Sequence, residues 1–150
     1  MLEDQGVKDF LVEIGGELRL RGKKKNGRLW QIAIEKPNAA ERTLHKVLTL
    51  TDVAIATSGD YRNFFEVNGV RFSHTIDPRN GFPITHKLAS VTILSKSAME
   101  ADALATAFMV LGPEEGFELA EKQKIPAFFI IKSDEGFVEK STSAFIEHTG

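Results

Sequence analysis

The 150-residue chain contains no cysteine. Disulfide bonds, thiol catalysis and cysteine-ligated zinc are therefore excluded for these residues. Its histidines, His45, His74, His86 and His148, show none of the close spacings that are typical of zinc sites. No apolar run approaches the roughly 20 residues that a membrane-spanning helix needs. A net charge of −2 gives no overall attraction to nucleic acid or to anionic lipid.

Short runs of alternating or β-branched apolar residues fill most of the chain. Hydrophobic residues make up 42 % of it, which is enough for one buried core in a domain of ordinary size. An Asn-Gly pair inside FFEVNGVRF (64–72) predicts a β-hairpin. The apolar patterns predict further strands at 10–14, 17–21, 29–35, 46–50, 53–57, 89–95, 127–132 and 136–140.

One helix is well marked in the second half of the chain. Ser97 is a natural N-cap, and Glu100, three residues later, completes the pattern of a capping box. The following AMEADALATAFMVL contains no helix breaker, and Gly112 ends the run. Pro113 then predicts a second helix that it opens at the first position. Two consecutive helices among many antiparallel strands indicate an α+β fold.

The segment EADALATA (100–107) suggests a metal site. Asp102 and Thr106 stand four residues apart on the expected helix, so their oxygens share one face. Alanines alternate around them, so a ligand can approach the helix closely. Oxygen ligands suit magnesium or calcium, and magnesium usually completes its shell with phosphate and water. The alternative is a small-residue packing face, with Asp102 favoured in the first turns by the helix dipole.

Two turn-like segments carry further polar groups. In ATSGDYRNFF (56–65), a strand runs into small residues that let the backbone approach a phosphate or a sugar, although the same residues are ordinary turn formers. In SHTIDPRNGFP (73–83), the run DPRNG predicts a turn. His74 stands three residues before Asp77, and a histidine held by a carboxylate can serve as a general base. A structural role on a strand is the alternative for His74.

Together these segments resemble a known family. VEIGGELRLRG, ATSGDYRNFFEVNGVRFSHTIDPRNGFP, ASVTILS and ADALATAFMVLG, in this order, resemble the ApbE family, the FAD:protein FMN transferases. The resemblance runs from about residue 10 to about residue 135, and the combination of ATSGDYR, HxxDPRxG and ADALAT is specific to it. Asn80 stands where the family often has threonine, and it keeps the turn chemistry.

The resemblance implies an α+β fold of the T-fold type and a magnesium-dependent enzyme. Such enzymes split the pyrophosphate of FAD, attach FMN to a threonine or serine hydroxyl of a target flavoprotein, and release AMP. By resemblance, His74 deprotonates the acceptor hydroxyl, while Asp102, Thr106 and the carbonyl of Ala105 hold Mg²⁺. The FAD site is matched by Thr57, Ser58, Gly59, Asp60, Tyr61, His74, Thr75, Ile76 and Asp77.

The resemblance also implies a longer parent protein. Family members carry an N-terminal half with a lipobox cysteine and further flavin contacts. Residues 1–150 are therefore expected to be the C-terminal portion of a single domain, from a periplasmic lipoprotein anchored to the inner membrane. Its expected partners are FAD and acceptor subunits of membrane redox complexes, with no nucleic acid. An uncovered sheet edge is expected to let the isolated chain self-associate or to make it depend on a companion chain.

Two other functions stay open. The first is an FAD-binding module without transfer activity, for which the lost N-terminal half would be the reason. The second is an interaction domain on the same scaffold with a decayed acceptor site. The intact His74, Asp102 and Thr106 argue against decay.

Overall fold

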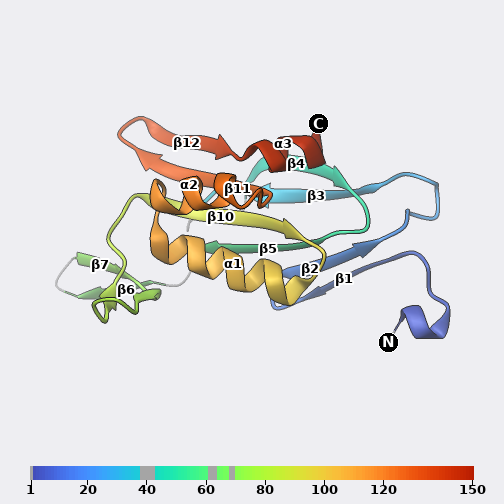
Figure 1. Cartoon of the computed structure of the whole chain (residues 1–150), viewed down its shortest axis with the longest axis horizontal. Coiled ribbons are helices and arrows are strands. Elements are labelled where there is room, and N and C mark those ends of the chain that lie inside the picture. The colour runs from blue at the N-terminus through green and yellow to red at the C-terminus, as the bar shows by residue number, and fades with distance from the viewer. Residues whose placement is uncertain (1, 38–42, 61–63, 68–69) are drawn as a thin grey trace.

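The main element of the fold is a six-stranded antiparallel sheet with the strand order β1-β2-β5-β10-β11-β12 (Figure 1). The computed structural model describes residues 2–37, 43–60, 64–67 and 70–150, with only the backbone described for 64–67, 70 and 71. The strands are β1 (Phe10–Ile14), β2 (Glu17–Arg21), β5 (Ala54–Gly59), β10 (Leu88–Ser95), β11 (Ala127–Ser133) and β12 (Gly136–Ser141).

Shorter elements surround this sheet. Within the described ranges, the remaining strands form three antiparallel pairs: β3 (Trp30–Glu35) with β4 (Leu44–Leu50), β6 (Phe64–Val67) with β7 (Val70–Ser73), and β8 (Ile76–Asp77) with β9 (Phe82–Pro83). The helices are α1 (Ala98–Leu111), α2 (Glu115–Lys122), α3 (Ser143–Thr149) and the short 3₁₀ helix η1 (Glu3–Gln5). None of the helices in the part of the chain described here is long and apolar enough to cross a membrane.

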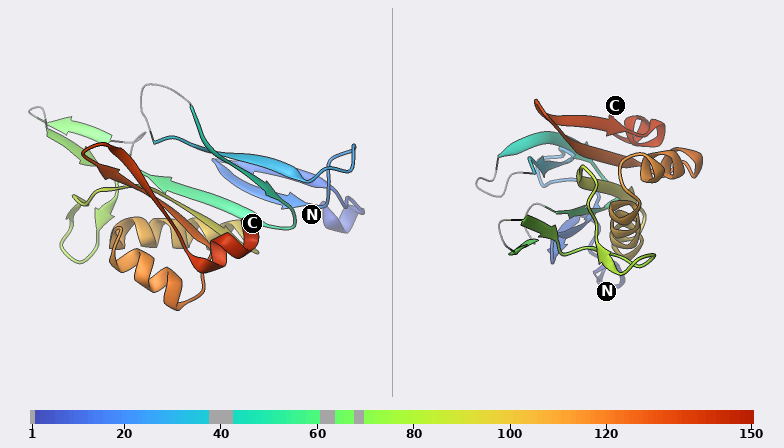
Figure 2. Two further views of the ribbon diagram at one scale, coloured as in Figure 1. Left: turned by 90° about the horizontal axis from the view of Figure 1, so that it is seen from above. Right: turned by 90° about the vertical axis from the view of Figure 1, so that its left-hand side faces the viewer.

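The sheet is covered on both faces. Helices α1 and α2 lie against one face, and the β3–β4 pair lies against the other (Figure 2). Neighbouring residues of one strand therefore enter different cores: Phe128 belongs to the core under β3–β4, and Phe129 to the core under α1 and α2. This double cover explains why seven of the eight residues of β10 are buried in a continuous run.

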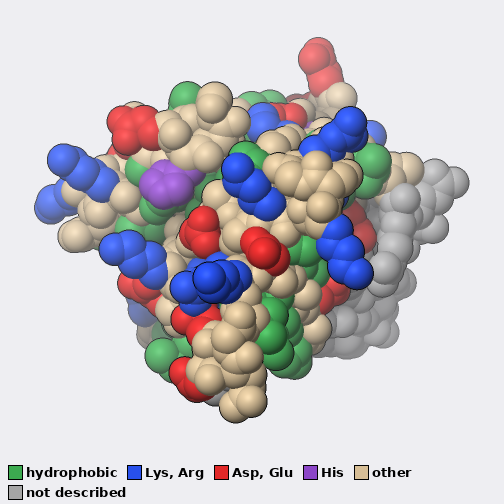
Figure 3. Space-filling view, turned by 90° about the vertical axis from the view of Figure 1, so that its right-hand side faces the viewer, with side chains coloured by type: hydrophobic (Ala, Val, Ile, Leu, Met, Phe, Trp, Pro, Cys, Tyr) green, Lys and Arg blue, Asp and Glu red, His purple; other side chains and the backbone are tan. Residues whose placement is uncertain are grey.

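Charged side chains of both signs lie at one end of the molecule. The face at the right-hand end of Figure 1 carries basic and acidic side chains side by side, so neither sign of charge dominates it (Figure 3). This distribution agrees with the small net charge of −2.

Most of the expected elements are confirmed. All the predicted strands form, within a few residues of their expected ends, and β6 pairs with β7 as the Asn-Gly signal predicts, although Asn68 and Gly69 lie outside the described residues. The α+β class is confirmed as well. The short pair β8–β9 and helix α3 have no counterpart in the sequence-based expectations.

Two predicted details of the helix ends are wrong. Ser97 is the N-cap of α1, but its side chain makes no capping bond, and the carboxylate of Glu100 accepts from the Ser95 hydroxyl. Pro113 does not open α2 at its first position, since that helix begins at Glu115. Gly112 ends α1 as expected, with its backbone N–H donating to the carbonyl of Phe108.

Candidate active site

A cavity of about 880 Å³ is bordered on one side by three segments that carry expected site residues. These are the end of β5, the segment that follows β7, and one face of α1. The predicted site residues that line it are Thr57, Ser58 and Gly59 from β5, His74, Thr75 and Ile76 from the segment after β7, and Asp102 and Thr106 from α1. The fold thus brings together the candidate base, the candidate metal ligands and most of the expected FAD-binding residues.

The end of β5 is fixed by hydroxyl contacts on both sides. The Thr57 hydroxyl lies 2.8 Å from the hydroxyl of Thr92, its register partner on β10. The next residue, Ser58, places its hydroxyl 3.2 Å from that of Thr106 on α1. Because hydroxyls both donate and accept, these two contacts orient the end of the strand toward the helix.

Helix α1 divides its residues between the core and the cavity. Ala101 and Ala105 are fully buried against the sheet, so their small side chains let the helix pack closely on it. Asp102 and Thr106 are exposed and line the cavity. The packing interpretation of this segment therefore holds for the face of Ala101 and Ala105. The metal site on the face of Asp102 and Thr106 stays a prediction.

The donors on α1 suit part of a hard-cation shell. Among the described residues, no group of three or more histidine, aspartate or glutamate side chains is arranged to hold a metal ion. Asp102 and Thr106 offer one carboxylate and one hydroxyl on a shared helical face beside an open cavity. This donor set fits a magnesium ion that takes its remaining ligands from phosphate and water.

Hydrogen bonds between Arg79 and Asp77 stabilise the turn after His74. Asp77 is buried, and its carboxylate accepts from the Arg79 backbone N–H at 2.9 Å, from Nε at 3.0 Å and from Nη2 at 2.9 Å. These hydrogen bonds hold the pKa of the Asp77 carboxyl below its ordinary value. Asn80 also keeps its expected turn role, since its side-chain oxygen accepts from the backbone N–H of Phe82 at 2.8 Å.

Some predicted site residues lie elsewhere. Asp60 is buried and pairs with Lys132 of β11, with an Nζ–Oδ2 distance of 2.5 Å. Neither Asp60, Asp77 nor the buried Ala105 lines the cavity with its side chain. Tyr61 lies outside the described residues. The functional roles of these residues stay predictions.

The sequence patterns predict no role for the opposite wall of the cavity. That wall comes from the β1–β2 hairpin and from β3, and it includes Glu13, Gly15, Gly16, Glu17 and Glu35. Gly15 and Gly16 have φ angles of 70° and 112°, which fits a tight turn that glycine adopts without strain. The IGG motif was the available signal, but only strand pairing shows that this hairpin faces α1.

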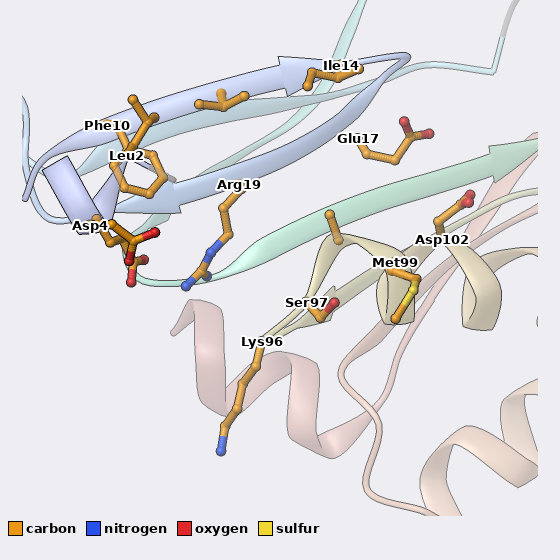
Figure 4. Close-up of a pocket in the computed structure, with 13 residues that line it drawn as sticks. Leu2, Asp4, Phe10, Ile14, Glu17, Arg19, Lys96, Ser97, Met99 and Asp102 are labelled. Atoms are coloured by element: carbon orange, nitrogen blue, oxygen red, sulfur yellow. The ribbon is translucent and has the colours of Figure 1, made fainter. Parts of the chain in front are cut away.

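A second cavity, of about 1110 Å³, lies on the other side of Asp102. Its lining is mainly apolar and includes Phe10, Val12 and Met99, with Arg19 among the charged residues. Figure 4 shows Glu17 and Asp102 at the end of this cavity that lies away from Leu2 and Phe10. Glu17 and Asp102 line both cavities, so the two hollows adjoin at the candidate metal ligand.

Comparison with known proteins gives a consistent result. A family model described as the ApbE family matches residues 1–129. The FAD:protein FMN transferase of Vibrio cholerae serotype O1 is 51 % identical over 144 residues, covering 96 % of this chain and 43 % of that protein. The protein of the same name from Haemophilus influenzae is 50 % identical over 145 residues, covering 96 % and 42 %.

A solved structure shows the same fold. The crystal structure of the Pseudomonas stutzeri flavinyl transferase ApbE in its apo form matches with a TM-score of 0.86 and 50 % identity, over 99 % of this chain and 46 % of that one. The chain therefore spans less than half the length of the relatives that it matches. The family model covers most of the chain, and the fold agrees with it. The chain belongs to the ApbE family.

Proposed function

We propose that the protein carrying this chain transfers FMN from FAD onto a threonine or serine hydroxyl of a target flavoprotein and releases AMP. The observation that carries the proposal is the meeting of His74, Asp102 and Thr106 in one cavity. Relatives that are 50 % identical or more are named FAD:protein FMN transferase, which supports flavin transfer as the reaction.

In the proposed reaction the acceptor oxygen attacks the phosphorus of the FMN half of FAD. One P–O bond forms to the acceptor, the P–O bond of the pyrophosphate bridge breaks, and AMP leaves with the bridging oxygen. The acceptor proton goes to the imidazole of His74, because a hydroxyl is a poor nucleophile until a base removes its proton. His74 is exposed at the cavity wall, where an incoming protein segment can reach it.

Magnesium is the cofactor that we propose for this site. Asp102, Thr106 and the carbonyl of Ala105 would hold it, and when bound it would offset the negative charge of the pyrophosphate as AMP departs. The hydroxyl of Ser58 contacts that of Thr106, so Ser58 orients the proposed threonine ligand. The small residues Ser58 and Gly59 leave this wall open to a phosphate.

The proposed partners follow from the family resemblance. The acceptor would be a flavoprotein subunit of a membrane redox complex, and the parent protein would be a periplasmic lipoprotein. Membrane fractionation of the expressing cells, with and without signal-peptidase inhibition, tests the proposed localisation. Recovery of the protein in the cytosolic fraction alone would contradict it.

The reaction is tested by following every flavin and nucleotide product. The complete gene product that carries these residues is incubated with FAD, Mg²⁺ and an acceptor protein. Transfer predicts AMP together with flavin covalently bound to the acceptor, and no free FMN. AMP with free FMN would indicate a pyrophosphatase. FAD binding without AMP would support the alternative, a flavin-binding module without transfer activity.

A further inference from the structure

His86 joins the segment that carries His74 to the end of α1. The His86 Nε2 atom lies 2.8 Å from the carbonyl oxygen of Met109, and the backbone N–H of Leu88 donates to Nδ1 at 3.3 Å. Because Nδ1 accepts this hydrogen bond, the ring proton sits on Nε2, which donates to Met109. The half-buried imidazole is thus engaged through both nitrogens, each with a backbone group.

The Met109 carbonyl belongs to the last turn of α1, where carbonyls lack partners within the helix. His86 supplies the missing donor. Gly112 makes room for the ring, because a Cβ atom at this position would lie 2.9 Å from His86 Cδ2. Gly112 also has a φ angle of 88°, which residues with side chains rarely adopt. The end of the helix is therefore shaped around this imidazole.

The hydrogen bond between His86 and Met109 lies between the two halves of the proposed active site. On one side, Ile84, two residues before His86, donates its backbone N–H to the carbonyl of Thr75 at 3.1 Å, and Thr75 follows His74. On the other side, Met109 is three residues from Thr106 on the same helix. Two hydrogen bonds and the short chain segments between them thus connect the candidate base to the candidate metal ligand.

An ion pair at the surface also joins the segment after His74 to the helices. Arg79 Nη1 lies 3.2 Å from Glu115 Oε2 at the start of α2, and the Arg79 side chain is 55 % exposed. Exposed ion pairs contribute little because water and salt screen them. The half-buried His86 bond is therefore the firmer of the two connections.

We propose that His86 is a positioning residue, whose bond to Met109 sets the distance between His74 and the Asp102–Thr106 face of α1. This inference rests on the proposed flavin transfer. His86 is not among the residues that line the cavity, so it acts through His74 and α1 and not on the substrate. Small displacements of reacting groups slow a reaction strongly, by about 10²-fold for a shift near 1 Å.

Three substitutions separate this role from simple packing. His86→Gln keeps an N–H donor near the position of Nε2 and can restore the bond to Met109. His86→Asn keeps an acceptor near Nδ1 for Leu88, but its side chain is too short to reach Met109. His86→Phe fills the same space and makes neither bond. Each variant is made in the complete gene product, and its folded fraction is measured by thermal unfolding.

The measurement is steady-state transfer of FMN from FAD to an acceptor protein, together with FAD affinity from fluorescence titration. We expect kcat to fall by about 10²-fold in His86→Asn and His86→Phe and to recover to within about 10-fold of wild type in His86→Gln. FAD affinity should change less than kcat in all three.

Near-normal kcat per folded molecule in His86→Phe would overturn the inference. A kcat of His86→Gln no higher than that of His86→Asn would overturn it as well. A parallel loss of FAD affinity and kcat would also overturn it, because the residue would then shape the binding site. Absence of transfer by the wild-type protein would instead refute the proposed function, and the positioning role with it. If the wild-type protein transfers FMN and the His86→Phe variant transfers it at a near-normal rate, the positioning role alone is wrong.

Discussion

The hydroxyl of Ser58 lies 3.2 Å from the hydroxyl of Thr106, although the two residues are 48 positions apart in the sequence. The contact joins the end of β5 to the exposed face of α1. It places a wall of the expected FAD site directly beside a proposed metal ligand.

Replacing Asp102 with alanine should abolish magnesium-dependent transfer and leave the fold intact. Asp102 is exposed, so its removal opens no core cavity. Alanine favours the helix by up to about 0.7 kcal/mol. Loss of the negative charge costs at most a part of the about 0.3–1 kcal/mol of a first-turn acid, because Asp102 lies just past the first turn. These effects oppose each other, so the melting temperature should shift little.

The matched control for this experiment is Asp102→Asn, which keeps the size and removes the charge. Both variants should lose the response to added Mg²⁺, measured as AMP release over a magnesium titration. Undiminished magnesium-dependent release in either one would remove Asp102 from the metal site.

Replacing His74 with alanine should slow transfer by about 10²–10⁴-fold, the usual contribution of a general base. FAD binding should survive, because the remaining cavity wall is unchanged. Added imidazole should restore part of the rate, since a free base can enter the space that the side chain leaves. The same imidazole should not accelerate the Asp102→Ala variant, which serves as the control. A His74→Ala variant with a normal rate would return this histidine to a structural role.

The hydrogen bonds between Asp77 and Arg79 predict that the stability of the folded state depends on pH. Side-chain hydrogen bonds from Arg79 lower the pKa of the Asp77 carboxyl in the folded state below the ordinary value of 3.8. A carboxyl with a lowered folded pKa contributes stability that is fully present above its unfolded pKa and is lost as the pH falls through the folded one. The contribution should therefore be constant from neutral pH down to about pH 4 and vanish below it.

Thermal unfolding of Asp77→Asn and of the wild type over the acid range measures this effect. The melting-temperature difference should be constant near neutrality and shrink in acid. Asp134→Asn is the control, because the Asp134 side chain is 99 % exposed. A wild-type advantage over Asp77→Asn that grows as the pH falls would contradict the assignment.

The 150 residues by themselves should self-associate through the apolar cavity beside β1. This strand is at one edge of the main sheet, Ile14 is 74 % exposed and Met99 is 82 % exposed. Exposed edges and apolar surfaces recruit partners. Light scattering should show a mass above that of the monomer, and Ile14→Lys with Met99→Lys should restore the monomer mass. Val47→Lys is the control, because Val47 is exposed on β4 and lines neither cavity. A monomer at every concentration would refute this prediction.

The sequence predicts the local parts of this structure well. The strand patterns, the end of α1 at Gly112 and the shared face of Asp102 and Thr106 all follow from spacing along the chain. These features depend on residues a few positions apart, and the periodicity of the backbone fixes them.

Features set by distant residues were not predictable in the same way. The carboxylate of Asp60 meets Lys132, which is 72 positions away. The β1–β2 hairpin faces α1 only because β2 pairs with β5. Contacts between residues far apart in the sequence depend on strand order and packing, and local sequence patterns do not predict these. The role of His86 at the Met109 carbonyl belongs to the same class.

The most direct test of the proposed transfer is the intact mass of the acceptor. An acceptor protein with one reactive threonine is incubated with FAD, Mg²⁺ and the complete gene product, and its mass is measured beside a version with valine at that position. The proposal predicts that the threonine protein gains the mass of FMN less one water, with one AMP released per FMN attached, and that the valine protein gains nothing. An unchanged acceptor mass in the presence of bound FAD would contradict flavin transfer as the function.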